Sequence, residues 1–248
     1  MTLPRFFAEP GTLIGAAPST DLVLDGDEGR HAAGVRRIRA GEQVEIADGS
    51  GAVARCTVTA AGQGHLDLLV DELELIPEPA LRFGLVQALA KGGRDEMAVE
   101  TATEVGIDLV LPWQAQRSVS RWEGPKVEKN TRRWATIARE AAKQSRRARI
   151  PHTEALRTTT ALAHRLAEAD LALVLHEDAV DPLVGVKLPD AGEVLLVVGP
   201  EGGIGESELA TLTAAGARPV RLGPEVLRTS SAGPIALGIL AATSGRWA

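Results

Sequence analysis

The stretch VLLVVGPEGGIGESEL, residues 194–209, is followed by VRLGPEVLRTSSAG, residues 220–233. In each stretch a short apolar run leads into a Gly-Pro loop and then into the start of a helix. Such runs are typical of strands that are buried on both faces of a parallel sheet. The carboxyl ends of neighbouring parallel strands meet at one edge, where open α/β sheets bind ligands. The two stretches therefore predict an α/β fold with two glycine-bearing loops at one ligand crevice.

The first loop does not have the spacing of a phosphate-binding loop. From Gly199 to Gly205 it reads G-x-x-G-G-x-G, which differs from both the dinucleotide and the P-loop fingerprints. Pro200 lacks an amide hydrogen and Glu201 adds a carboxylate, so a polyphosphate would lose a donor and meet a negative charge. We expect a cationic or zwitterionic ligand instead. We also expect the amino end of the following helix to stabilise Glu201.

The order of the predicted elements indicates two domains. Residues 6–76 show strand-like alternation around the turn ADGSG, and the proline-bearing linker IPEPA follows at 76–80. Beyond the linker, strands and helices alternate, which favours a parallel sheet with helices on both faces. The predicted strands are 81–89, 108–113, 171–175, 193–198 and 219–222; the predicted helices lie at 94–105, around 134–145, from 206 and from about 231. The expected domains are residues 1–76 and 77–248.

Composition limits the class of protein. The 248 residues are 44% hydrophobic, enough for a sizeable core. A single cysteine, Cys56, excludes a disulfide framework, and the alternating segment around it predicts a half-buried strand residue rather than a reactive thiol. No apolar run approaches the ~18 residues of a membrane span, and the start lacks a signal-peptide core. We expect a cytoplasmic protein with no membrane association and no metal site.

The charges are unevenly distributed along the chain. The net charge is −6, yet residues 117–149 contain eleven Lys or Arg against three Glu. Such a segment can contact nucleic-acid phosphates, although a solvated helix face accounts for the charge equally well. Within it, Trp134, Ile137, Ala138 and Ala141 recur at helical spacing, which predicts a helix with one narrow apolar face. Trp134 is expected to anchor the core rather than to stack on a base.

The two loops, with LVLHED at 173–178, resemble the small-subunit ribosomal RNA methyltransferase E family, uridine-N3 methyltransferases of the knotted SPOUT class. The resemblance extends to PRFF at 4–7, AGEQVEIADGSG at 40–51, QALAKGGRDEMAVETATEVGID at 87–108, QRSVSRW at 116–122 and RWATIAREAAKQSRRARIP at 133–151. It implies a PUA-like RNA-binding barrel followed by a SPOUT domain with a deep trefoil knot. It also implies S-adenosylmethionine as cofactor, a homodimer, and 16S ribosomal RNA as partner, within the small ribosomal subunit.

The resemblance also implies roles for particular residues. It assigns cofactor binding to three loops. The residues are Leu175 and His176 in the first loop, Val198, Gly199, Pro200, Gly202 and Gly203 in the second, and Leu222, Gly223, Pro224, Val226 and Leu227 in the third. RNA binding falls to Arg36, Arg37, Lys91, Arg94, Arg117, Arg121, Arg132, Arg139, Lys143, Arg146 and Arg147. For catalysis, Arg228 is the first candidate because a cation would stabilise the uracil anion, and Glu201 is the second, as base or substrate holder.

Some alternatives remain open at this stage. Gly199 and Gly223 could simply end strands, His176 could be a structural histidine, and Arg228 could form a structural ion pair. Four positions depart from the family pattern: Glu225 replaces Arg, Gln116 replaces Glu, and Ser230-Ser231 replaces Glu-Thr. Both serines are expected to serve as N-caps of the last helix. Two other functions remain: an RNA-binding assembly factor without turnover, and a methyltransferase with a different RNA target.

Overall fold

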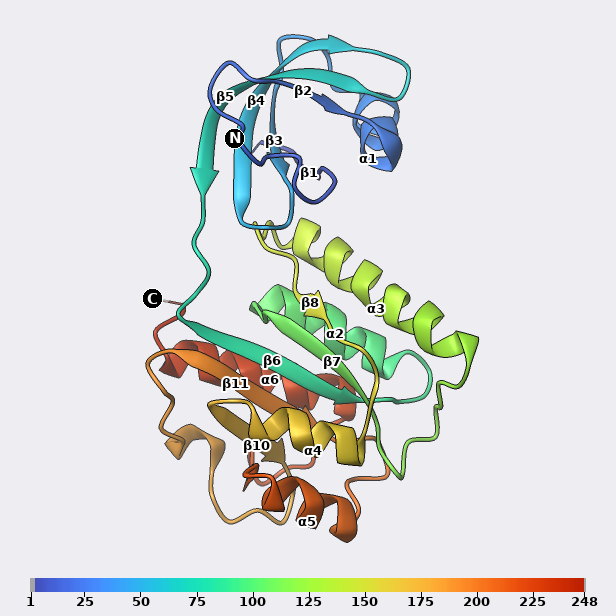
Figure 1. Cartoon of the computed structure of the whole chain (residues 1–248), viewed down its shortest axis with the longest axis vertical. Coiled ribbons are helices and arrows are strands. Elements are labelled where there is room, and N and C mark those ends of the chain that lie inside the picture. The colour runs from blue at the N-terminus through green and yellow to red at the C-terminus, as the bar shows by residue number, and fades with distance from the viewer. Residues whose placement is uncertain (1–2, 248) are drawn as a thin grey trace. The chain divides into compact units, whose positions relative to one another are not determined.

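Two β-sheets organise the chain in the computed structural model, which describes residues 3–247 (Figure 1). Residues 1, 2 and 248, at the ends of the two predicted domains, lie outside the described residues. The first sheet belongs to a unit formed by the chain up to Glu78 together with Ala142–Ile150. The second belongs to a unit formed by Pro79–Ala141 and the chain from Pro151 onward. The first unit is thus built from two separate segments of sequence.

The first unit is β-rich, as its alternating pattern predicts. Its strands lie side by side in the order β1-β3-β4-β5-β2, antiparallel except for the β1–β3 pair. Their bounds are β1 Arg5–Phe7, β2 Asp21–Leu24, β3 Gln43–Ala47, β4 Ala52–Ala61 and β5 Leu66–Leu75, with helix α1 at Gly26–Arg30 and π-helix η1 at His31–Val35. Cys56 on β4 is fully buried among Val44, Val58 and Leu68, so its predicted half-burial is an underestimate.

Ala142–Ile150 completes this unit by packing and by charge. Ala142 and Ala148 pack against Phe7 and its neighbours in a small buried cluster. The Lys143 ammonium lies 2.5 Å from a Glu28 oxygen, and the Arg146 guanidinium lies 2.6 Å from a Glu45 oxygen. The basic segment therefore supplies counter-charges to the acidic side chains of the first unit.

The second unit contains a seven-stranded parallel sheet in the order β12-β10-β11-β6-β7-β8, with β9 pairing to β7. The strand bounds are β6 Leu81–Ala88, β7 Leu109–Gln114, β8 His152–Thr153, β9 Arg157–Thr158, β10 Leu171–Leu175, β11 Gly192–Val198 and β12 Arg218–Val220. The helix bounds are α2 Arg94–Val105, α3 Pro125–Gln144, α4 Thr159–Ala167, α5 Glu206–Ala214 and α6 Thr229–Thr243, with a 3-10 turn η2 at Leu183–Gly185. The predicted α/β alternation is confirmed.

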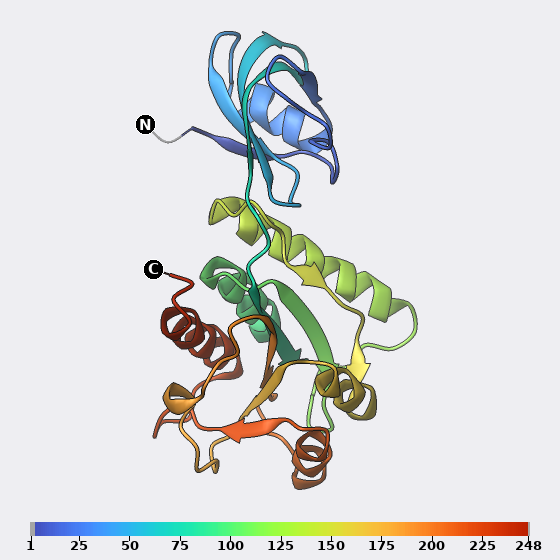
Figure 2. The ribbon, with the colours of Figure 1, turned by 60° about the vertical axis from the view of Figure 1, so that its left-hand side comes forward.

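Helices cover both faces of this sheet. One buried cluster joins the sheet to α2, α3 and α6, and a second joins it to α4 and α5. Figure 2 shows α2 and α6 on one side of the strands and α4 and α5 on the other. Because each central strand is buried on both faces, its residues are apolar without alternation. No helix within residues 3–247 has the length and apolar character to cross a bilayer.

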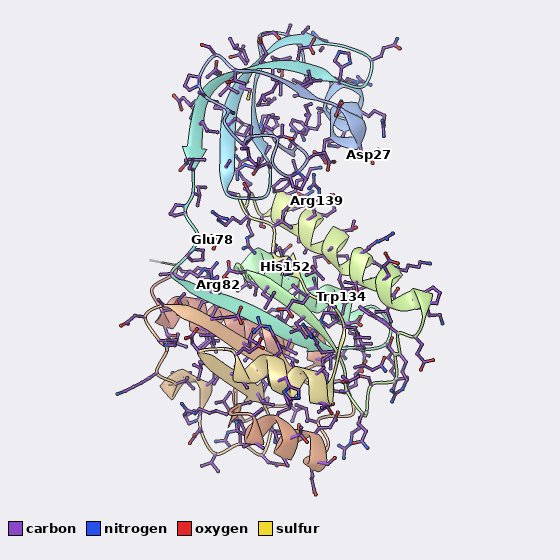
Figure 3. All side chains as sticks on the ribbon, viewed as in Figure 1. Asp27, Glu78, Arg82, Trp134, Arg139 and His152 are labelled. Atoms are coloured by element: carbon purple, nitrogen blue, oxygen red, sulfur yellow. The ribbon has the colours of Figure 1, made fainter. Side chains whose placement is uncertain are left out.

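The basic helix α3 packs by one face, as its spacing predicts. Trp134, Ala138 and Ala141 are buried, whereas Arg132 and Arg133 are exposed. Trp134 packs edge to face against Trp122, with 5.2 Å between the ring centres. Trp134 and Arg139 are labelled on α3 in Figure 3. The prediction of Trp134 as a core anchor is confirmed.

The prediction that Ser230 and Ser231 cap the last helix is wrong. Helix α6 begins at Thr229, Arg228 is its N-cap, and no side chain caps it. Both serines therefore lie in the first turn. Thr229 makes tertiary hydrogen bonds to Gly199 and Gln87 at this point. These bonds fix the first residue of the helix at Thr229, although serine is the better N-cap residue by preference.

Candidate active site

Three loops meet around a cavity of about 340 Å³ at the carboxyl edge of the second sheet. They follow β10, β11 and β12, which are neighbours in one parallel arrangement, so their carboxyl ends lie together. The cavity is lined by Arg94, Leu175, His176, Glu177, Val198, Gly199, Pro200, Glu201, Gly203, Ile204, Arg221, Leu222, Gly223, Pro224, Glu225, Val226, Leu227, Arg228, Thr229 and Ala232. Its volume lies within the range of small-molecule sites.

Most residues expected at the cofactor line this cavity, and one does not. Gly202 is outside the lining because Arg117 packs over it and donates a 3.0 Å hydrogen bond to its carbonyl oxygen. A Cβ on Gly202 would lie 3.2 Å from the Arg117 Cβ. Gly202 thus allows the loop after β7 to approach the loop after β11.

The loop after β11 is held in a tight turn. The Gly203 amide donates to the Pro200 carbonyl at 2.9 Å, and Gly203 has φ +71°. A Cβ on Gly199 would lie only 2.7 Å from Ile204 Cγ1, closer than real contacts allow. Gly199 therefore does more than end a strand, because a side chain there would displace Ile204 from the cavity wall.

The loop after β12 leaves its backbone groups available. From Leu222 to Leu227, no amide or carbonyl group makes a hydrogen bond to another part of the chain that the structure describes. Leu222 and Gly223 are partly buried at the cavity wall. Partly buried backbone groups need a hydrogen-bond partner. This loop can therefore present donors and acceptors to the polar edge of a ligand, next to the apolar side chains of Leu175 and Val198.

A buried chain of hydrogen bonds supports the cavity floor. The Gln87 amide nitrogen donates to the Thr229 hydroxyl at 2.8 Å, and this hydroxyl donates to the Gly199 carbonyl at 2.7 Å. Gln87 is fully buried near the end of β6, and its Oε1 has no partner among the described residues. The sequence analysis missed both Gln87 and Thr229. Their contact spans 142 residues of sequence, which no local pattern could reveal.

Glu201 has partners other than those expected. Its Oε1 accepts a 3.1 Å hydrogen bond from the Arg94 guanidinium and a 3.2 Å bond from the Lys91 amide. The hydrogen bonds of Glu201 do not come from the following helix α5, as the expectation would have it, but from Arg94, the first residue of α2, and from Lys91 just before it. At the start of α5, Glu208 accepts from the Gly205 amide instead.

Asp95, at the start of α2, holds the loop that carries Lys91. It is buried and accepts a 3.1 Å hydrogen bond from the Ala90 amide. Burial raises the pKa of the Asp95 carboxyl, while the hydrogen bonds from the Ala90 and Glu96 amides act in the opposite direction. Across residues 3–247 no group of side chains has the composition of a metal site.

Arg228 lies at the cavity with its charge unneutralised. It lines the cavity and is exposed, and its guanidinium has no hydrogen bond or ion pair to any described residue. The alternative of a structural ion pair therefore has no partner in this structure. An exposed cation beside a ligand cavity can stabilise negative charge on a bound reactant.

The cations expected to bind RNA fall into several environments. Arg36 and Arg37 are exposed after η1, and Lys91 is exposed beside the cavity. Arg121 donates to the Gln116 carbonyl at 3.2 Å, and Arg132 pairs with Glu128 on its own helix. Arg94 and Arg117 hold the loop after β11, Lys143 and Arg146 pair with acids of the first unit, and Arg139 and Arg147 also have partners. Among the cations expected to bind RNA, Arg36, Arg37 and Lys91 are thus available for a ligand, whereas the others already make contacts within the protein.

Comparison with known proteins connects this geometry to a family. A family model described as an RNA methyltransferase domain matches residues 77–241, and one described as an RNA methyltransferase PUA domain matches residues 24–71. The chain is 50% identical over 240 residues to ribosomal RNA small subunit methyltransferase E of Mycobacterium bovis, covering 94% of this chain and 92% of that protein. The Bacillus subtilis protein of the same name is 30% identical over 248 residues, covering 96% of each.

A solved structure shows the same architecture. It is a protein from Legionella pneumophila, described as a methyltransferase, in complex with the bound cofactor SAM, with a TM-score of 0.84, 27% identity and coverage of 98% of both chains. The likeness extends over both units of the present chain.

Proposed function

We propose a function for this chain from its family. The chain belongs to the small-subunit ribosomal RNA methyltransferase E family. We propose that it transfers a methyl group from S-adenosylmethionine to N3 of a uridine in 16S ribosomal RNA. The observation that carries this proposal is the three-loop cavity with the unpaired Arg228 at its wall. The relatives are named for methylation of small-subunit RNA, and the similar Legionella protein has SAM bound.

The residues present fit S-adenosylmethionine. The backbone groups of residues 222–227 have no internal partner among the described residues and suit the polar edge of an adenine ring. Leu175 and Val198 supply apolar surface, and Gly199 has no side chain to displace Ile204. Glu177 and Glu201 place carboxylates at the same cavity, which suits a cationic ligand and disfavours a polyphosphate. Bound S-adenosylmethionine would supply an electrophilic methyl group.

The residues of the chain would then prepare the uracil ring. N3 carries a weakly acidic proton, and its loss to solvent water leaves negative charge on the ring and its oxygens. Arg228 would stabilise that charge by donating hydrogen bonds from its free guanidinium. Glu201, whose Oε1 accepts from Arg94 and the Lys91 amide, would hold the loop after β11 in position rather than take the proton.

The two domains would have different functions. We assign RNA binding to the PUA-like domain at residues 1–76, and cofactor binding and methyl transfer to residues 77–248, of which Ala142–Ile150 packs within the first unit. Support comes from the match of residues 24–71 to a PUA domain and of residues 77–241 to a methyltransferase domain. The exposed Arg36 and Arg37 are available for RNA in the first of these domains.

Two further features are proposed on the basis of family membership. One is the deep trefoil knot in the SPOUT-type second unit. The other is a homodimer, supported by the exposed apolar side chains of Met97 on α2 and Ile235 on α6. We propose action in the cytoplasm because the proposed substrate is RNA of the small ribosomal subunit.

Two measurements test the proposed function. Calorimetry with S-adenosylmethionine should show binding to the purified protein; neither heat nor a thermal shift would favour a non-catalytic RNA-binding assembly factor. Mass spectrometry of small-subunit RNA from cells lacking the gene should show the loss of one N3-methyluridine. Unchanged uridine methylation, with a loss elsewhere, would identify a different RNA target.

A further inference from the structure

The cations of residues 117–149 separate into two groups along helix α3. At the far end of the segment, Lys143, Arg146 and Arg149 contact Glu28, Glu45 and the Ile76 carbonyl, all within the first unit. At the near end, Lys126 and Lys129 are exposed, and neither ammonium has a hydrogen bond or ion pair with any described residue. The free charge is therefore concentrated in the first two turns of the helix.

Those two turns lie toward the cavity edge of the second sheet. Strand β7 ends at Gln114 on the edge where the three cavity loops lie, and α3 begins eleven residues later at Pro125. The connecting loop stays at this edge, since Arg117 bonds to the Gly202 carbonyl in the loop after β11. With a rise of ~1.5 Å per residue, Lys126 and Lys129 fall in the first ~7 Å of a helix about 30 Å long.

The two lysines also lie on the outward face of the helix. Positions three apart share a face, so Lys126 and Lys129 project together. At ~100° per residue, the buried residues Trp134, Ala138 and Ala141 are centred roughly 90° around the helix from Lys126 and roughly 150° from Lys129. Arg121, exposed in the preceding loop, donates to the Gln116 carbonyl, next to Arg117 in the sequence.

Free lysines on an acidic protein suit one kind of partner. Lys143 would have to break an ion pair to bind a phosphate, whereas Lys126 and Lys129 would only release counterions and water. The net charge of −6 repels RNA from the rest of the surface, so a local positive ridge also orients it. Phosphate contacts of this kind position a nucleic acid without reading its sequence.

We infer that Arg121, Lys126 and Lys129 form a ridge that binds the RNA backbone beside the target uridine, an assignment that rests on the proposed function. The ridge adds two lysines that the motif-based analysis did not select. It places Lys143 and Arg146 outside the RNA contact, because their charges neutralise acids of the first unit.

The double variant Lys126→Ala/Lys129→Ala tests the ridge, with Lys187→Ala as a matched control. Lys187 is exposed and precedes β11, at the opposite edge of the sheet from the cavity. Methylation of small-subunit RNA is measured over a range of salt concentrations for wild type and both variants. In the double variant, KM for RNA should rise on the order of tenfold, and the slope of log KM against log salt should fall by about 1 to 2. Its kcat at saturating RNA and its S-adenosylmethionine affinity should match wild type.

Each other outcome has a distinct meaning. A wild-type KM in the double variant, or an equal rise in Lys187→Ala, would overturn the ridge while leaving the proposed function intact. Absence of methylation by the wild-type protein would instead contradict the proposed function, and with it the ridge. Circular dichroism and retained S-adenosylmethionine binding exclude misfolding as the cause of a raised KM.

Discussion

The Thr229 hydroxyl donates a 2.7 Å hydrogen bond to the Gly199 carbonyl and accepts one from buried Gln87. One side chain thus links the start of α6 to the loop after β11 and to the end of β6. Thr229 is buried, so removal of its hydroxyl would leave the Gly199 carbonyl without this donor, whereas the Gln87 amide nitrogen would keep its 3.0 Å bond to the Ala88 carbonyl. The shape of the cofactor cavity therefore depends on a residue that need not touch the cofactor.

Replacement of this hydroxyl should lower the stability of the protein and its affinity for S-adenosylmethionine. Thr229→Val is expected to lower the free energy of unfolding by about 1–3 kcal/mol and to raise the Kd for S-adenosylmethionine, because Gly199 loses its anchor. Thermal unfolding and calorimetry measure the two effects. Thr229→Ser keeps the hydroxyl and should stay close to wild type. If Thr229→Val also matched wild type, the hydrogen-bond chain would be dispensable.

Arg228 should act on turnover rather than on cofactor binding. Arg228→Ala is expected to lower kcat on the order of 10²–10³-fold, because the free guanidinium would no longer stabilise charge on uracil. The Kd for S-adenosylmethionine should remain within about twofold of wild type. Arg218→Ala, which removes an exposed guanidinium from the start of β12, is the control. Equal losses of turnover and cofactor affinity would reassign Arg228 to the cofactor site.

The Arg94–Glu201 pair should behave as a positioning pair. Glu201→Gln and Arg94→Ala are each expected to reduce kcat/KM, and the loss in the double variant should be smaller than the sum of the two, because they share one contact. The pH profile of kcat should keep its shape in Glu201→Gln. Disappearance of its acid limb, with a loss on the order of 10²–10⁴-fold, would show instead that Glu201 is the general base.

Cys56 should be inert in the folded protein. Burial, with a smaller contribution from the charge of Asp71, raises the pKa of the Cys56 thiol from its usual 9.0 to about 12. A chromogenic thiol reagent at pH 8 should react only after unfolding in denaturant. Rapid labelling of the native protein would contradict the buried placement.

The same shift affects stability at high pH. The unfolded thiol ionises above pH 9.0, whereas the folded thiol stays protonated to about pH 12. The contribution of Cys56 to stability is therefore complete below pH 9 and is lost as the pH rises toward 12. Denaturant unfolding of wild type and Cys56→Ala across this range should show a smaller decline with pH in the variant.

The cavity could be placed from sequence because its parts obey local rules. Each of the three loops follows an apolar run, and parallel pairing brings the carboxyl ends of β10, β11 and β12 together. The G-x-x-G-G-x-G spacing and Pro200 argued only against a phosphate-binding loop; the tight turn from Pro200 to Gly203 came from the structure. The packing face of α3 followed from helical periodicity alone.

The remaining features depend on tertiary contacts that leave no local signal. Glu201 was assigned to the helix that follows it, yet its partners lie more than one hundred residues earlier. The serines after Thr229 have the composition of caps, but the bond to Gly199 moves the helix start. Charge counting could not separate Lys143 from Lys129, because only the fold brings Glu28 to one of them.

The two-part construction of the first unit has a consequence for how the chain is made. Its five strands are complete once Leu75 has left the ribosome, but Phe7 and Glu28 must wait for Ala142–Ile150 to be synthesised. Until then, the nascent unit carries an uncovered apolar patch and a Glu28 carboxylate without its lysine partner, whereas Glu45 can already pair with Arg5. We expect its final folding step to follow synthesis of α3, so that the segment encoded first becomes stable only after more than half of the message has been translated.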